Sequence, residues 1–96
     1  MPKEAVMKHF YVNNLPAYYK LFPKLSRREI EVLSMSCAGL DRNEIAIELN
    51  ISVHTVNNHF NNAVTKYELK NLGKLKALFY FVINESRVNS ADALPD

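Results

Sequence analysis

Apolar residues in the middle of the chain recur every three or four positions, the spacing of one face of an α-helix. Between residues 26 and 38 this spacing follows Ser26 and Glu29, a pair that can cap a helix start reciprocally. Gly39 comes directly afterwards and can take the left-handed conformation that often ends a helix. The pattern predicts a first core helix whose apolar residues are Ile30, Val32, Leu33, Cys37 and Ala38.

Two more helices follow at short intervals. Asp41 and Glu44 repeat the capping pair before a helix over 42–49, and Asn50 is suited to end it. The next helix is expected over about 53–66, after a connection of only three or four residues. So short a connection joins two helices at a steep angle, as a helix-turn-helix unit. No strand-like alternation competes with this pattern, so we predict an all-α fold.

The apolar spacing also predicts a further helix over about 73–85. The residues of this helix expected to face the core are Leu75, Leu78, Phe79 and Val82. The polar, proline-containing residues 87–96 predict a flexible tail. The central domain is therefore assigned to residues 25–86.

Residues 1–24 form an aromatic-rich extension before this domain and predict two more helices, over about 3–12 and from Pro16 onward. Two interpretations remain open for the aromatic side chains of this extension. They cover the core of a small domain, or they form a separate docking surface for a partner.

The helix over 53–66 has one apolar and one polar face. Its polar face carries a row of uncharged residues: His54, Asn57, Asn58, Asn61 and Asn62. No acidic residue interrupts this helix, and Ser52 and Thr55 at its start can receive a phosphate together with the helix dipole. An asparagine amide matches the N6 and N7 edge of adenine, so this row predicts base reading at A·T-containing sites. The alternative is an ordinary solvated face.

The other chemistry of the chain argues against an enzyme. The net charge is only +2, although residues 1–28 are mainly basic and residues 29–48 mainly acidic. Cys37 is the single cysteine, and the three histidines lack metal-ligand spacing, so we expect no metal and no cofactor. No segment is apolar enough to span a membrane and no signal peptide is recognisable, which predicts a cytoplasmic protein.

Three segments together resemble a LuxR/GerE-type helix-turn-helix DNA-binding domain over roughly residues 25–83. The segments are LSRREIEVL, AGLDRNEIAIELNIS and TVNNHFNNAVTK. The resemblance implies a four-helix domain with an extra N-terminal segment in this chain. It implies further that the third helix enters the major groove and that the fourth supplies the dimer contact.

The resemblance also assigns roles to individual positions. The residues expected to read bases are Asn57, Asn58 and Asn61. The residues expected to contact the DNA backbone are Arg42, Asn43, Ser52, His54, Thr55, Asn62, Lys66 and Lys70. The residues expected to form the dimer contact are Leu75, Leu78, Phe79, Phe81 and Val82.

The chain departs from the family pattern at positions where a cation is usual. Asn43, Asn57 and Leu72 stand at such positions, which predicts weaker nonspecific binding and a shallower salt dependence than in typical relatives. Only some 24 residues precede the motif, so we expect no receiver or ligand-binding domain in this chain.

Two functions follow from these features. The first is a homodimeric, sequence-specific transcriptional regulator with double-stranded DNA as its partner, and with RNA polymerase or another regulator as a further candidate. The alternative is a protein-binding module that forms heterodimers with another regulator through Phe79, Tyr80, Phe81 and the aromatic N-terminus.

Overall fold

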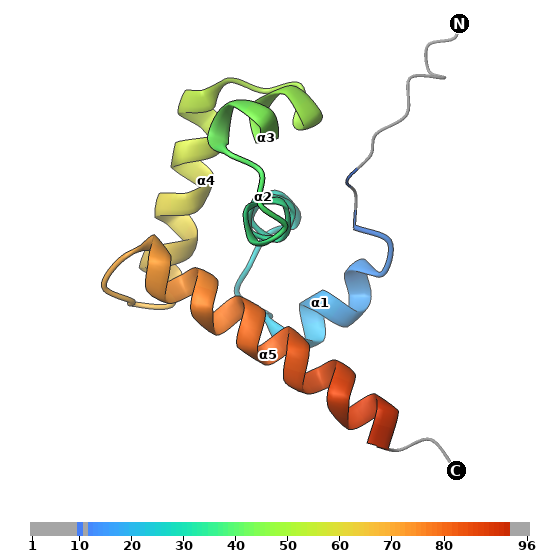
Figure 1. The fold of residues 1–96 in the computed structure, drawn as a ribbon. Coiled ribbons are helices and arrows are strands. Elements are labelled where there is room, and N and C mark those ends of the chain that lie inside the picture. The colour runs from blue at the N-terminus through green and yellow to red at the C-terminus, as the bar shows by residue number, and fades with distance from the viewer. Residues whose placement is uncertain (1–9, 11, 93–96) are drawn as a thin grey trace, which may run out of the picture.

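The computed structural model describes residue 10 and residues 12–92, and these residues form helices joined by short connections (Figure 1). The helices are α1 (Leu15–Leu21), α2 (Arg27–Cys37), α3 (Arg42–Leu49), α4 (Val53–Lys66) and α5 (Leu72–Asp92). No strand occurs among these described residues. The all-α prediction is confirmed.

The starts of the three central helices are fixed by side chains close in sequence. In α2 the Ser26 hydroxyl accepts from the Glu29 amide at 3.2 Å, while the Glu29 carboxylate accepts from the Ser26 amide at 2.9 Å. Asp41 and Glu44 form the same reciprocal pair at the start of α3, with both distances 2.8 Å. Ser52 caps α4. These bonds satisfy backbone amides that have no partner within a helix.

The same helices also end in one shared geometry. A single residue has a positive φ, and the backbone amide of the next residue donates a hydrogen bond to a carbonyl near the end of the helix. These residues are Gly39 (φ 105°), Asn50 (φ 56°) and Glu68 (φ 53°). The closing bonds run from the amide of Leu40 to the carbonyl of Met35, from Ile51 to Ala46 and from Leu69 to Val64. Gly39 and Asn50 were expected as stops, whereas Glu68 was not, because glutamate has no preference for this conformation.

Helix α2 lies at the centre of the molecule, with α3 and α4 on one side of it and α5 crossing on the other (Figure 1). Ile30, Val32 and Leu33 of α2 are fully buried, as are Ile45 of α3, Val56 of α4 and Leu75 of α5. The helices therefore share one core. This core holds α3 and α4 in a fixed relation through the packing of their apolar faces.

The aromatic residues before α2 join this core. The ring of Phe22 stacks on Phe79 at 4.8 Å and meets Tyr67 edge-on at 6.1 Å, while Tyr18 of α1 lies 6.1 Å from Phe79. Phe22 is almost fully buried. For these two aromatic residues, Tyr18 and Phe22, the interpretation that they cover the core is the one that the packing supports.

Two expected boundaries differ from the structure. The helix expected over 3–12 lies mostly outside the described residues, and Phe10 and Val12 within it are not helical. Helix α5 continues to Asp92, beyond the helix end at about residue 85 that the apolar spacing predicted, so the helix includes the first residues of the segment expected to be a flexible tail. Residues 87–92 contain neither glycine nor proline, so their polar composition alone does not stop a helix.

Candidate nucleic-acid interface

Helix α4 presents a polar face because its apolar residues are used in the core. Val56, Phe60 and Ala63 are buried. The opposite face exposes His54, Asn58, Asn61 and Asn62. The first turn of α4 carries no acidic residue, so no carboxylate there would repel a phosphate. The face predicted from helical spacing is present, with Asn57 as an exception.

Asn57 does not share the position of the other asparagines. Its side chain is partly buried, and its Oδ1 atom is buried without a hydrogen-bond partner among the described residues. Two-point reading of adenine needs Oδ1 as an acceptor as well as the amide nitrogen as a donor. In this conformation Asn57 cannot supply both. The sequence did not reveal that Asn57 lies on the flank of α4, because helical spacing grouped this residue with the exposed ones.

The start of α4 brings two hydroxyl groups together. The Ser52 hydroxyl accepts from the Thr55 amide at 3.0 Å and lies 2.9 Å from the Thr55 hydroxyl. In either direction of the bond between the hydroxyls, one O–H group remains available to an outside acceptor. This proton and the positive end of the helix dipole together favour an anion such as a phosphate.

Helices α3 and α4, with the turn at residues 50–52, form the helix-turn-helix unit. A search against protein-family models matches residues 23–78 to bacterial regulatory proteins of the luxR family, which covers more than half of the chain. The chain belongs to the luxR family. Members of this family are generally DNA-binding transcription regulators. A search of curated proteins found no significant match, and neither did a search of solved structures.

In this luxR-family domain cations lie beside the middle of α4 and at its C-terminal end. Arg42 and Lys70 were expected to contact the DNA backbone, whereas Lys24 was not among the expected residues. The Arg42 guanidinium, from the start of α3, lies over the ring of Phe60 at 5.3 Å. Asn43 beside it is exposed. The ammonium of Lys24 lies over the ring of Tyr67 at 5.4 Å, which places this cation at the C-terminal end of α4. Lys70, just beyond that end, is exposed.

Lys66 has a partner that the sequence did not reveal. Its ammonium lies 2.7 Å from the Glu29 carboxylate, whose side chain is only 4% exposed. The same carboxylate caps α2 through the Ser26 amide. Lys66 therefore links the end of α4 to the start of α2, and its charge is partly neutralised before any phosphate approaches.

The expected dimer residues of α5 divide into two groups. Leu75 and Phe79 are buried in the core of the protomer, so the prediction that they contact a second copy is wrong. Leu78 and Val82 are partly buried. Phe81 is 61% exposed, as is its neighbour Tyr80. The division arises because one stripe of α5 is already used to pack against α2, α4 and α1.

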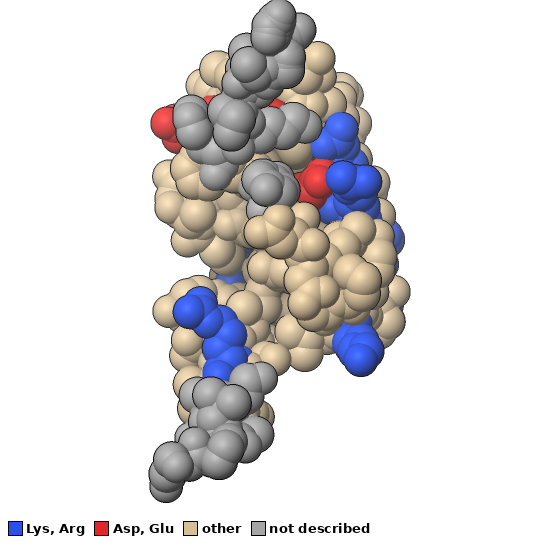
Figure 2. Space-filling view, turned by 90° about the vertical axis from the view of Figure 1, so that its right-hand side faces the viewer, with Lys and Arg blue, Asp and Glu red and all other residues tan. Residues whose placement is uncertain are grey.

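No candidate metal or membrane site was found in the part of the chain that the structure describes. No cluster of three or more potential metal ligands occurs within this part. None of its helices is both long and apolar enough to cross a membrane. Seen from the side of α1, Lys and Arg side chains lie in separate groups near the edges of the molecule, and uncharged residues fill the middle (Figure 2).

Proposed function

We propose that the protein binds double-stranded DNA sequence-specifically as a homodimer and regulates transcription in the cytoplasm, with α4 in the major groove. The observation that carries this proposal is the row of exposed asparagines on α4, on a helix without acids in its first turn. Asn58 and Asn61 are the proposed base readers. Asn57 joins them only if its side chain turns outward on binding.

The energetics favour a functional role for these asparagines. In a helix, asparagine is less favourable than alanine by at most about 0.7 kcal/mol. A two-point contact to adenine discriminates against the wrong base by about 1–3 kcal/mol. A single such contact therefore outweighs the helix cost of the residue in the bound state.

The proposed backbone contacts flank this row. One hydroxyl of the Ser52 and Thr55 pair at the start of α4 can donate to one phosphate, and Arg42, which lies beside α4, is the proposed contact to another. At the opposite end, Lys24 and Lys70 are the proposed cations. Lys66 can contribute only if it exchanges Glu29 for a phosphate.

The proposed dimer contact lies on the exposed stripe of α5. This stripe contains Ala77, Tyr80, Phe81, Asn84 and Val88. A homodimer that reads two half-sites needs its two α4 helices in successive major grooves, about 34 Å apart. The DNA site would then be two-fold symmetric.

The test is a selection of bound duplexes from a random DNA library with purified full-length protein. We expect one enriched, two-fold symmetric site containing adenines. Alanine at Asn58 and Asn61 should remove the enrichment, whereas Asn89→Ala, at an exposed residue of α5 outside the proposed dimer stripe, is a matched control that leaves it unchanged. Circular dichroism checks that all variants are folded.

Phe81→Asp tests the dimer separately. We expect this variant to be monomeric in sedimentation and to bind one half-site weakly. If folded wild-type protein enriches no sequence even at low salt, DNA reading by this chain is wrong. In that case the heterodimer alternative, in which Phe81→Asp is damaging and the asparagine changes are silent, takes its place.

A further inference from the structure

A buried carboxylate of α2 holds the cation at the end of α4. The Glu29 Oε1 atom accepts from the Ser26 amide at 2.9 Å and from the Lys66 ammonium at 2.7 Å. The side chain of Glu29 is 4% exposed, whereas that of Lys66 is 38% exposed. The ion pair therefore has one partner in the interior and the other at the surface of the proposed DNA-binding helix.

Lys66 is the only lysine or arginine in α4. A free cation at this position of a DNA-binding helix would neutralise a phosphate and release its counterion, which strengthens binding to DNA of any sequence. In this protein a carboxylate already occupies the ammonium. The charge that α4 itself offers to a phosphate therefore depends on whether Glu29 releases Lys66.

Exchange of Glu29 for a phosphate is unfavourable. If Lys66 left, the Glu29 carboxylate would keep its charge in the interior without its cation, which is strongly destabilising. A contact between lysine and phosphate at the surface forms in water and salt and gains less. The capping bonds with Ser26 also hold Glu29 in place, so the carboxylate does not follow the lysine outward.

We propose that Glu29 withholds Lys66 from DNA and thereby limits how strongly the domain binds DNA of any sequence. The ion pair stays closed in the complex, so α4 adds no cation of its own to the phosphate contacts. Glu29 thus lowers the affinity that does not depend on sequence and leaves the choice of site to Asn58 and Asn61. Glu29 is a positioning residue that acts through Lys66, and this inference rests on the proposed DNA binding by α4.

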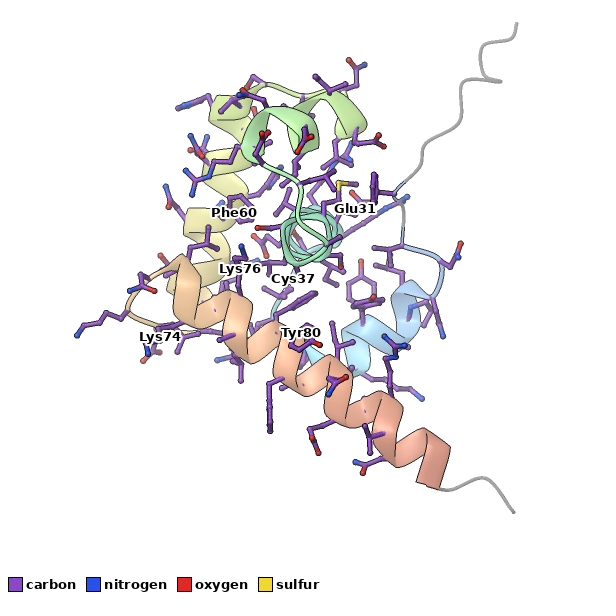
Figure 3. All side chains as sticks on the ribbon, viewed as in Figure 1. Glu31, Cys37, Phe60, Lys74, Lys76 and Tyr80 are labelled. Atoms are coloured by element: carbon purple, nitrogen blue, oxygen red, sulfur yellow. The ribbon has the colours of Figure 1, made fainter. Side chains whose placement is uncertain are left out.

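Helix α2 offers a matched control for this carboxylate. The Glu31 side chain is 8% exposed, and its carboxylate pairs with Arg28 at 2.9 Å and with Arg27 at 3.2 Å. Figure 3 shows Glu31 on the side of α2 that faces away from α4. Glu31→Gln therefore makes the same charge change on the same helix without freeing the cation of α4.

The test measures how full-length protein binds a duplex of random sequence at several potassium chloride concentrations, by fluorescence anisotropy. Glu29→Gln removes the charge but keeps an oxygen for the Ser26 amide, so Lys66 is freed while the cap remains. We expect the plot of log affinity against log salt to steepen by about 0.9 per protomer. Between about 50 and 200 mM salt, the affinity should then fall roughly three- to fourfold more than in the wild type. Glu31→Gln should leave the slope unchanged.

A second variant tests the same pair from its other side. Lys66→Met should leave the wild-type slope unchanged, because a lysine that stays on Glu29 makes no phosphate contact. Added to Glu29→Gln, Lys66→Met should return the slope to the wild-type value. Circular dichroism checks that each variant is folded, and Lys66→Met alone keeps the test decisive if Glu29→Gln does not fold.

A measurement without DNA examines the ion pair itself. Lys70 is exposed and serves as an internal reference for the reactivity of Lys66. We expect acetic anhydride to acetylate Lys66 severalfold more slowly than Lys70 in the wild type, because the Lys66 ammonium is held by Glu29. In Glu29→Gln the two rates should become similar. Mass spectrometry of peptides follows both sites.

Three results would overturn the proposal while DNA binding stands. They are an unchanged slope in Glu29→Gln, an equal steepening in Glu31→Gln, and a shallower slope in Lys66→Met. Equal acetylation of Lys66 and Lys70 in the wild type would also overturn it, because the pair would then be open in solution. If neither the wild type nor Glu29→Gln binds any duplex, the proposed function is wrong and this inference fails with it.

Discussion

At the scale of single residues, Asn57 illustrates how much a sequence can predict about a binding face. The side-chain type and the helical phase of all four asparagines follow from the sequence, and Asn58, Asn61 and Asn62 are exposed as expected. The burial of the Asn57 Oδ1 depends on neighbouring side chains that local spacing does not define. A flank position on a helix is decided by tertiary packing.

The buried Oδ1 gives Asn57 a stability cost that the exposed asparagines lack. We expect Asn57→Ala to raise the free energy of unfolding by about 1–3 kcal/mol, because it removes an unpaired buried acceptor. Asn61→Ala should gain at most about 0.7 kcal/mol from helix propensity alone. Urea denaturation followed by circular dichroism measures both values. Equal increases in the free energy of unfolding would show that the Asn57 side-chain oxygen accepts a hydrogen bond in solution.

At the scale of elements, helix starts were predictable and long-range links were not. Each start depends on a side chain that bonds an amide three residues away, and such a pair is visible in the sequence. The ion pair of Lys66 with Glu29 joins residues 37 positions apart, and it changes the role of a residue that we had assigned to phosphate binding. Only the packing of α4 against α2 reveals it.

Loss of this ion pair should loosen the end of α4. We expect Lys66→Met to lower the free energy of unfolding by about 1–3 kcal/mol, because Glu29 keeps a buried charge without its cation. Lys70→Met, at an exposed lysine nearby, is the control and should change it little. Adding Glu29→Gln to Lys66→Met should restore part of the loss, since glutamine retains the cap. No restoration would mean that the pair is not the cause.

The unexpected helix end at Glu68 carries backbone strain. A non-glycine residue with left-handed φ costs about 1–2 kcal/mol, and glycine costs about 0.5–1 kcal/mol in unfolded-state entropy. We therefore expect Glu68→Gly to raise the thermal midpoint slightly, by a stabilisation of about 0.5–1 kcal/mol. Glu68→Ala keeps the strain and should gain nothing. A gain as large with alanine would point to the lost charge instead.

At the scale of the whole molecule, charge is distributed unevenly while the net charge stays at +2. The polar face of α4 is largely uncharged, cations lie beside its middle and at its C-terminal end, and exposed carboxylates lie at the start of α3, on Asp41 and Glu44. The sequence predicted the acidic middle of the chain and the neutral row. It could not predict that Arg42 and Lys66 are held by Phe60 and Glu29, because these contacts form only on folding.

A shallow salt dependence of DNA binding should follow from this distribution. Adding one cation to the exposed face by Asn62→Lys should steepen the plot of log affinity against log salt by about 0.9 per protomer. The plot is measured by fluorescence anisotropy over a range of potassium chloride concentrations. Asn89→Lys, at an exposed residue of α5 outside the proposed dimer stripe, is the matched control and should leave the slope unchanged. A similar change in both variants would indicate a general charge effect.

The single thiol of the molecule lies where α2 meets α5. The Cys37 Sγ is 3.8 Å from the Lys76 carbonyl oxygen (Figure 3), and burial raises the pKa of this thiol, against a smaller opposing effect of the Lys76 charge. Below its ordinary pKa of 9.0, the folded protein therefore holds even less thiolate than the unfolded chain, and alkylation should be slower. Equal rates in buffer and in urea would contradict this.

Because the partly buried Cys37 lies where α2 meets α5, its alkylation rate is a probe of the contact between these two helices. Because the described residues contain no second thiol, the rate of modification needs no labelling mutation and reports from one place. If the alkylation rate falls when DNA is added, DNA binding by α4 strengthens the packing of α5, the proposed dimer helix, against α2. The alkylation rate of Cys37 in the unmodified protein would therefore report whether DNA binding by α4 affects the helix proposed to form the dimer.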